Sequence, residues 1–124
     1  MTTKLGVILL TCRNKVGTKF LFARQRGDTF QLPVVEYSQD CSFLVSAFEY
    51  LVSLGIPPGD IRPLETYQTK IISQELLVLP FTINALHTID GTIWMSYEET
   101  LIDPRNQSLA AGIILKGHLQ RQSA

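Results

Sequence analysis

Residues 31–56, QLPVVEYSQDCSFLVSAFEYLVSLGI, begin as an extended segment, pass through a loop and end in one well-marked helix. Within this stretch, apolar side chains recur at steps of three and four positions, which is the spacing of a buried helix face. The expected core positions are Phe43, Leu44, Ala47, Leu51 and Leu54. Gly55 follows them, and glycine commonly ends a helix. The stretch therefore predicts a helix over residues 42–54 that packs on the rest of the domain.

The other side of this predicted helix carries a second, shorter set of residues. At about 100° per residue, Glu49, Val52 and Ser53 fall together, with Val45 beside them. Glu49 is therefore a single carboxylate among largely apolar neighbours. It is either a solvated helix residue or an acid or ligand of a functional site.

The segments around residues 31–56 are predicted to be mostly strands. Apolar runs bounded by turn residues predict strands at residues 4–13, 18–26, 29–32 and 92–96 and an extended segment at residues 61–72. Residues 65–72 of this segment are predicted to form a hairpin with residues 75–86. Pro80 lies inside this hairpin and implies an edge or bulge position, because proline has no N–H to donate to a neighbouring strand.

Two further helices are predicted after the last strand. Ser96 and Glu99 have the spacing of a capping box, which begins a short helix. The pair Asp103-Pro104 ends it. Residues 107–120 then form a terminal amphipathic helix. Its expected packing residues are Leu109, Ile113, Ile114 and Leu119.

Composition excludes several classes of protein. The chain has 124 residues and is 45% hydrophobic, which suits one domain, residues 1–124, with a continuous core. Eleven basic and eleven acidic residues give a net charge of zero, so the chain lacks the field expected of a binder of nucleic acid polymers or membranes. Low net charge also makes self-association less costly, which leaves a homodimer as an open alternative. Cys12 and Cys41 show no metal-site spacing and no signal peptide precedes them, so we expect reduced thiols and a cytoplasmic location.

The order of these elements resembles the Nudix hydrolases. The shared features are a strand ending in Phe-Ala-Arg-Gln-Arg, a Leu-Pro pair before the loop, a helix ending in Leu-Gly-Ile, a hydrophobic hairpin and an Ile-Trp-Met-Ser segment before the terminal helix. The resemblance implies an α+β fold, namely an α/β/α sandwich with a mixed β-sheet, a box helix and a C-terminal helix. The alternative is an unrelated α+β domain whose helix happens to end in Leu-Gly-Ile.

The resemblance is weakest in the catalytic motif of the family. The Nudix box reads Gly, five residues, Glu, seven residues, then Arg-Glu-aliphatic-any-Glu-Glu-any-Gly-aliphatic. When the box is aligned on the end of the predicted helix, only Glu49, Gly55 and Ile56 match. The family Gly falls on Val34, its first Glu on Asp40, its Arg on Phe48, and its Glu pair on Val52 and Ser53.

These departures concern the metal. In the family, three Glu residues on one helix face hold Mg²⁺ against a diphosphate, and this hard dication needs several oxygen ligands. The helix predicted here offers Glu49 alone, so no metal or other cofactor is expected. The first hypothesis is a degenerate Nudix-like domain without diphosphate hydrolase activity, which binds a nucleotide or other small phosphorylated ligand or associates with a protein.

Four residues complete the candidate ligand-binding set. The resemblance places Arg24 and Arg26 near the strand that lines the family's substrate cleft, where an arginine can pair with phosphate. Glu36 and Asp40 lie in the loop before the helix and are the nearest replacements for the missing carboxylates.

The second hypothesis keeps the family's reaction. It is a Mg²⁺-dependent hydrolase of compounds linked through a nucleoside diphosphate, with a metal site rebuilt around Glu49. The additional ligands are Glu36, Asp40, Glu65, Glu75 or Glu99. His87 and His118 have no partner at a recognisable spacing and belong to neither hypothesis.

Overall fold

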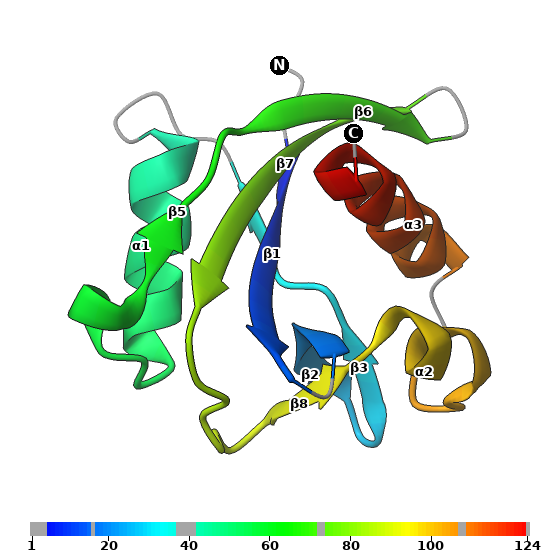
Figure 1. Cartoon of the computed structure of the whole chain (residues 1–124), viewed down its shortest axis with the longest axis horizontal. Coiled ribbons are helices and arrows are strands. Elements are labelled where there is room, and N and C mark those ends of the chain that lie inside the picture. The colour runs from blue at the N-terminus through cyan, green and yellow to red at the C-terminus, as the bar shows by residue number, and fades with distance from the viewer. Residues whose placement is uncertain (1–4, 16, 37–41, 72–73, 107–108, 124) are drawn as a thin grey trace.

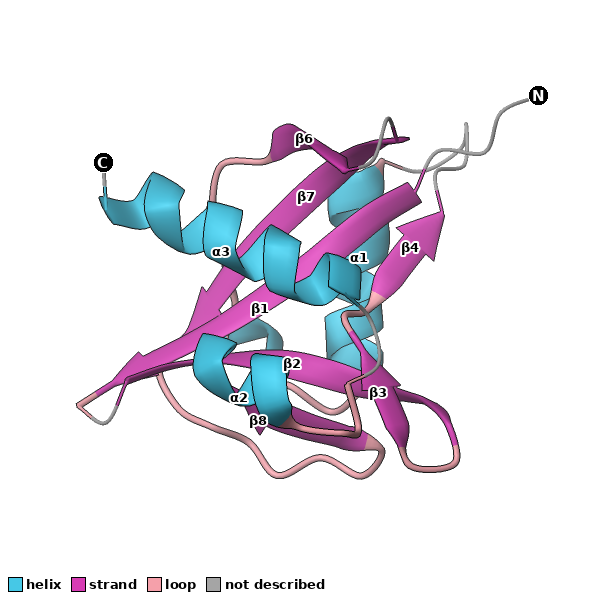
Figure 2. Ribbon diagram, turned by 90° about the vertical axis from the view of Figure 1, so that its right-hand side faces the viewer, coloured by secondary structure: helices cyan, strands magenta, loops and turns pink. Residues whose placement is uncertain are grey.

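The computed structural model describes residues 5–15, 17–36, 42–71, 74–106 and 109–123. These residues form an α+β sandwich, in which helix α1 covers one face of a mixed β-sheet and helix α3 covers the other (Figure 1). Figure 2 shows α3 crossing the face of β1 and β7, with α1 behind the sheet. The expected fold class is therefore confirmed. No helix in the described ranges is long and apolar enough to cross a membrane.

The strands are β1 (Leu5–Asn14), β2 (Gly17–Arg26), β3 (Thr29–Gln31), β4 (Val34–Glu36), β5 (Arg62–Pro63), β6 (Tyr67–Ile71), β7 (Gln74–Ile83) and β8 (Thr92–Met95). The helices are α1 (Phe43–Ser53), α2 (Tyr97–Ile102) and α3 (Leu109–Ser123), with a short 3₁₀ turn, Pro58–Asp60, between α1 and β5. The main sheet order is β3-β2-β1-β7-β5, while β4 pairs with β1, β6 with β7 and β8 with β2. Of these pairings only β1 with β7 is parallel.

Strand β1 is buried on both faces and separates two cores. Its residues Val7 and Leu9 pack in the core under α3, whereas Ile8 and Leu10 pack in the core under α1. Such a strand reads as a continuous apolar run instead of an alternating one, as the sequence of β1 does.

Helix α1 has the limits that its sequence predicts. The Oγ of Ser42 accepts a hydrogen bond from the N–H of Val45 at 3.1 Å, which caps the first turn. At the other end Gly55 has a φ of 103°, a conformation that residues with a side chain rarely adopt. Ala47 and Leu51 are fully buried, as expected.

Leu44 corrects the sequence prediction, because 42% of it is exposed. The buried line runs through Phe43, Ala47 and Leu51 at steps of four residues, and Leu44, in the first turn of the helix, lies about 60° from Ala47 around it. Its leucine side chain therefore lies at the margin of the core.

The loop before α1 contains a strand that was not predicted. Residues Val34, Val35 and Glu36 pair antiparallel with Val7, Gly6 and Leu5 of β1. Because β2 pairs with β1 only from Thr11 onward, the start of β1 has room on that side for this short neighbour. The remainder of the predicted loop, residues 37–41, lies outside the described residues and includes Asp40 and Cys41.

The predicted hairpin is present, but the extended segment predicted at residues 61–72 is divided into two strands. Strand β6 pairs with β7 from Tyr67–Val78 to Ile71–Gln74, and β5 pairs with β7 separately, further along. Pro80 lies between these two pairings and opposite Leu9 of β1, so it is in an inner strand and not at an edge. The N–H of Leu64 donates to the Pro80 carbonyl at 2.9 Å. The amide and the carbonyl of one strand residue point to the same side. The position where Pro80 lacks an N–H therefore faces the break between β5 and β6, where no ladder partner needs that donor.

The two C-terminal helices follow their predicted order. The capping box of α2 is present, because the Ser96 Oγ accepts from the Glu99 N–H and the Glu99 Oε1 accepts from the Ser96 N–H, both at 3.1 Å. In α3, Ile114 is buried and Leu119 partly buried, as expected. Ile113 is a correction, since 52% of it is exposed. The inward face of α3 runs through positions 111, 114, 115 and 118, which leaves Ile113 on the outer side.

Candidate functional site

The outward side of α1 presents a single carboxylate. Glu49 and Val45 are exposed, and the Ser53 hydroxyl donates to the Tyr50 carbonyl of its own helix at 2.6 Å. Val52 is half-buried, because it packs against the core under α1. This side of the helix therefore has one acidic group, an exposed valine at position 45 and a partly covered valine at position 52.

Phe48 occupies the position of the family's arginine. It is half-buried and packs in the same core as Leu51. The site that would brace a group of helix carboxylates is thus filled by an aromatic ring, which can neither donate a hydrogen bond nor carry charge.

The predicted ligand-binding residues make no direct polar contact with Glu49 in the described part of the chain. Within the described ranges, no hydrogen bond or ion pair joins Glu49 to Glu36, Arg24 or Arg26, and all four side chains are exposed. The Arg24 guanidinium lies over the ring of Phe30, 5.6 Å from its centroid. Arg26 lies at a register shift between β2 and β3.

The carboxylates proposed for a rebuilt metal site are not grouped either. Among residues that the structure describes, no group of three or more His, Cys, Asp or Glu could hold a metal ion. Glu65 and Glu75 are exposed. The Glu99 carboxylate already has two partners, since its Oε1 accepts a hydrogen bond from the Ser96 N–H and lies 3.3 Å from the Lys19 Nζ. The hydrogen bond from Ser96 is the main cause of its lowered pKa, which keeps this carboxylate ionised and held in the cap.

His87 and Trp94 have structural roles. The Trp94 Nε1–H donates to the His87 carbonyl at 2.9 Å, and the Trp94 ring is partly buried in the core under α1. The His87 Nε2 lies 3.7 Å from an oxygen of Asp60, which ties the loop after β7 to the 3₁₀ turn.

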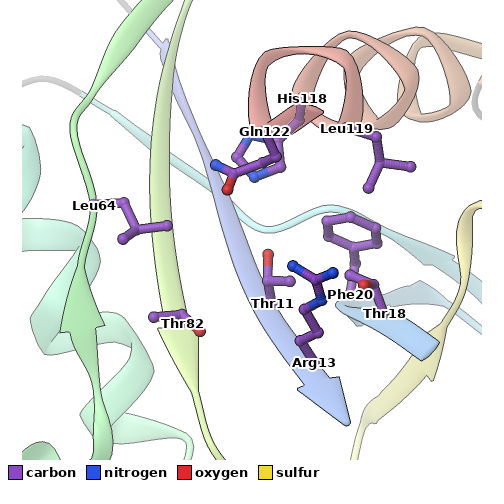
Figure 3. Close-up of a pocket in the computed structure, with 9 residues that line it drawn as sticks. All are labelled: Thr11, Arg13, Thr18, Phe20, Leu64, Thr82, His118, Leu119 and Gln122. Atoms are coloured by element: carbon purple, nitrogen blue, oxygen red, sulfur yellow. The ribbon is translucent and has the colours of Figure 1, made fainter. Parts of the chain in front are cut away.

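A cavity of about 460 Å³ opens between the sheet and the C-terminal turns of α3 (Figure 3). Its floor comes from two rows across the strands. Thr82, Thr11 and Phe20 are register partners across β7, β1 and β2, and Arg13 is opposite Thr18 in the next row. The walls and roof are Leu64, His118, Leu119 and Gln122.

His118 closes the inner end of this cavity. It is only 3% exposed, its Nδ1 lies 2.9 Å from the Tyr67 hydroxyl, and the two rings stack with centroids 5.9 Å apart. The Phe20 ring meets the His118 ring edge-on, with 6.2 Å between the ring centroids. The central carbon of the Arg121 guanidinium lies 3.9 Å from the centroid of the Tyr67 ring. Burial, with a smaller contribution from Arg121, lowers the pKa of His118, so the imidazole is neutral near pH 7.

Sequence reasoning missed this cavity because its residues come from four distant segments. One signal was available: His118 follows positions 111, 114 and 115 at helical spacing, which places it on the apolar face of α3. Its partner Tyr67 has no corresponding signal, since the contact of β6 with α3 depends on the pairing of β6 with β7 in the sheet.

Two floor residues of the cavity have unused polar groups. The Oγ1 of Thr11 is buried and has no hydrogen-bond partner in the described structure. The side chain of Arg13 is exposed, and Figure 3 shows its guanidinium turned toward the cavity. No carboxylate lines the cavity, and Arg13 has no acidic partner among the described residues.

Comparison with known proteins gives a fold but no sequence relative. No protein-family model and no curated protein matches the chain. Among solved structures, the Ap4A hydrolase of C. elegans superposes with a TM-score of 0.71 at 11% identity, over 98% of this chain and 99% of that one. RenU, a Nudix hydrolase from M. smegmatis, gives 0.70 at 12% identity, over 97% and 86%.

The Nudix domain of NrtR from Shewanella oneidensis, in a structure with ADP ribose, is also similar. Its TM-score is 0.57 at 12% identity, over 95% of this chain and 86% of that domain. All three matches extend over nearly the whole chain, which agrees with the element order, the mixed sheet and the positions of α1 and α3. This chain therefore has the fold of the Nudix hydrolases.

Proposed function

We propose that this Nudix-fold domain binds a small phosphorylated ligand of the nucleotide class and does not hydrolyse diphosphates. The observation that carries the proposal is the surface of α1. Glu49 is exposed and is the only carboxylate on that helix, with Phe48 and Val52 partly buried where the family has charged residues.

The number of oxygen ligands decides against a metal at this surface. Mg²⁺ prefers octahedral oxygen coordination and gives up its water reluctantly, so it is retained where several carboxylates or phosphates converge. Glu49 alone supplies one exposed carboxylate. Such a site binds Mg²⁺ too weakly to hold the ion that would lower the pKa of an attacking water and polarise a diphosphate.

Binding without hydrolysis is consistent with the fold. The NrtR domain, which has the same architecture, holds ADP ribose in its solved structure. For this chain, the ligand class remains a proposal that rests on the fold together with the arginine residues of the sheet, Arg24, Arg26 and Arg13. A guanidinium pairs with a phosphate through two parallel N–H donors, whether or not a metal is present.

A protein-association role is the second candidate. It is favoured by apolar side chains on the surface of α1 and β4, where Val34 is 43%, Leu44 42% and Val45 46% exposed. A homodimer through this surface predicts a concentration-dependent sedimentation coefficient. A variant with Val45 changed to Lys then sediments as a monomer at every concentration.

A phosphate-release assay tests the absence of hydrolysis. The wild type and Glu49→Gln are incubated with nucleoside triphosphates, ADP-ribose and dinucleoside polyphosphates, each with Mg²⁺ or Mn²⁺. We expect both proteins to remain at background for every substrate. Turnover by the wild type that Glu49→Gln abolishes would establish the rebuilt-site hydrolase instead.

A thermal-shift titration tests the binding. A ligand that binds only the folded state stabilises it by RT ln(1 + [L]/Kd), so the unfolding midpoint rises with the ligand concentration. We expect ADP-ribose or a mononucleotide to raise the midpoint equally with Mg²⁺ and with EDTA. A shift seen only with Mg²⁺ would contradict metal-free binding.

A further inference from the structure

We propose that the cavity between the C-terminal turns of α3 and the end of β1 binds the phosphate group of a small ligand, with Arg13 as its ion-pairing residue and the Thr11 hydroxyl as a hydrogen-bond donor. The inference rests on the proposed ligand-binding function and assigns it a place. This place is on the α3 face of the sheet, opposite the α1 face that carries Glu49.

The charge of the cavity favours an anion. Arg13 is the one charged side chain among its lining residues, and its guanidinium is turned inward (Figure 3). A guanidinium with no carboxylate partner in the described residues keeps its full set of donors for a ligand, and its planar fork matches two phosphate oxygens. A cationic ligand would meet no negative group on this lining.

The hydroxyl of Thr11 gives an independent reason for a polar ligand. Its Oγ1 is buried without a partner, which is an unfavourable state for a hydroxyl. The register places Thr82 on one side of it and Phe20 on the other, and neither satisfies it. A phosphate oxygen in the cavity would accept this hydrogen bond. Ligand binding would thereby satisfy the hydroxyl of Thr11.

The C-terminal end of α3 carries partial negative charge that repels an anion, and the side chain of Arg121 offsets this charge. The last carbonyls of a helix carry partial negative charge. Arg121 lies in the last turn of α3 and over the Tyr67 ring, so it supplies a positive charge at the same end. His118 is neutral and contributes no charge of either sign at pH 7.

The size of the cavity sets the ligand class. A volume of about 460 Å³ exceeds what inorganic phosphate fills and lies in the range usual for small-ligand sites. Leu64 and Leu119 form apolar parts of the wall, and the Gln122 amide is a polar group of the roof. The ligand that fits is therefore a phosphate monoester that carries a ring or sugar, such as a mononucleotide.

Affinity measured by calorimetry tests the assignment, with AMP, ADP-ribose and inorganic phosphate as probes in EDTA. Arg13→Gln removes the charge and keeps the length of an exposed side chain. Thr11→Val removes only the hydroxyl. Lys116→Gln is the control, because it removes one exposed positive charge from α3 at a position that does not line the cavity.

We expect Arg13→Gln to weaken binding of AMP or ADP-ribose about tenfold or more, as the loss of a charge-assisted pair requires. Thr11→Val should weaken it several-fold and should raise the unfolding midpoint of the ligand-free protein. Lys116→Gln should leave the dissociation constant within about twofold of the wild type, since screening in water makes a distant surface charge weak.

Three results would overturn the assignment. The first is a wild type that binds none of the probes at millimolar concentration. The second is an Arg13→Gln variant that binds the probes with the affinity of the wild type. The third is an equal loss of affinity in Arg13→Gln and Lys116→Gln. An unaffected Arg13→Gln with intact wild-type binding moves the ligand to another site and leaves the proposed function standing. Hydrolysis by the wild type ends the proposed function, whereas the effect of Arg13→Gln on affinity still decides the place of binding.

Discussion

Truncation of Leu51 should destabilise the protein far more than the same truncation of Leu44 in the same helix. Leu51 is fully buried against the sheet, whereas 42% of Leu44 is exposed. Leu51→Ala removes three buried carbon atoms at about 0.8 kcal/mol each, or about 2.4 kcal/mol. The cavity left in a core that does not collapse raises the loss to about 3–4 kcal/mol. For Leu44→Ala, exposure reduces the transfer loss and alanine is the better helix former, so we expect about 1 kcal/mol or less.

Equilibrium unfolding in urea measures both losses. The single tryptophan, Trp94, packs in the core under α1 and reports on that core by fluorescence, while circular dichroism reports on the whole chain. Both variants should keep the wild-type m-value, so that the shift in midpoint gives the change in stability. Losses of equal size in the two variants would refute the assignment of the buried face of α1.

Two further predictions concern single residues. Gly6→Ala should cost about 1–3 kcal/mol of unfolding free energy, because a Cβ there would lie 2.8 Å from the Phe43 ring, and the urea midpoint measures it; an unchanged midpoint would show that this ring moves away freely. The pKa of His118, which faces the Tyr67 hydroxyl and Arg121, is lowered by burial, so the unfolded state binds the proton more tightly. Its contribution to stability is therefore complete above the unfolded pKa near 6.5 and is lost as the pH falls through the folded value. Urea midpoints between pH 7 and pH 5 should fall more steeply in the wild type than in His118→Gln, and parallel slopes would contradict this.

The sequence of α1 was sufficient to predict the helix, its start at Ser42 and its end at Gly55. Its apolar spacing, Ser42 and Gly55 are local signals, and local signals determine where a helix begins and ends. The capping box of Ser96 and Glu99 was predictable for the same reason. The isolation of Glu49 also followed from the sequence alone, since the neighbouring helix positions are visible without coordinates.

Features that depend on the sheet were not predictable. The inner position of Pro80 depends on the parallel pairing of β7 with β1, and no local pattern specifies that pairing. The exposure of Leu44 and Ile113 depends on the direction from which the sheet approaches each helix. Gly112 is instructive, because a Cβ there would lie 3.3 Å from Leu101 of α2. The absence of a side chain at Gly112 therefore allows the two helices to approach closely.

The candidate cavity illustrates the same limit. Thr11 and Thr18 look like ordinary strand residues in the sequence, and Arg13 looks like a surface cation. Only the antiparallel register of β1 with β2 places them on one floor. The unpaired state of the Thr11 hydroxyl is a property of the packed molecule and leaves no trace in the order of residues.

The parallel pairing of β1 with β7 also determines when the domain can fold during synthesis. Residues Gly6 to Cys12 find their partners at Leu77 to Ile83, across more than half the length of the chain. A ribosome therefore releases β1, β2 and α1 well before the strand that completes their sheet, and Ile8 and Leu10 lack one neighbour during that interval. Contacts between such distant segments slow folding and prolong the exposure of apolar strands. We expect this domain to acquire protease resistance only after β7 has left the exit tunnel, so that a nascent chain arrested before β7 contains no smaller unit that is stable by itself.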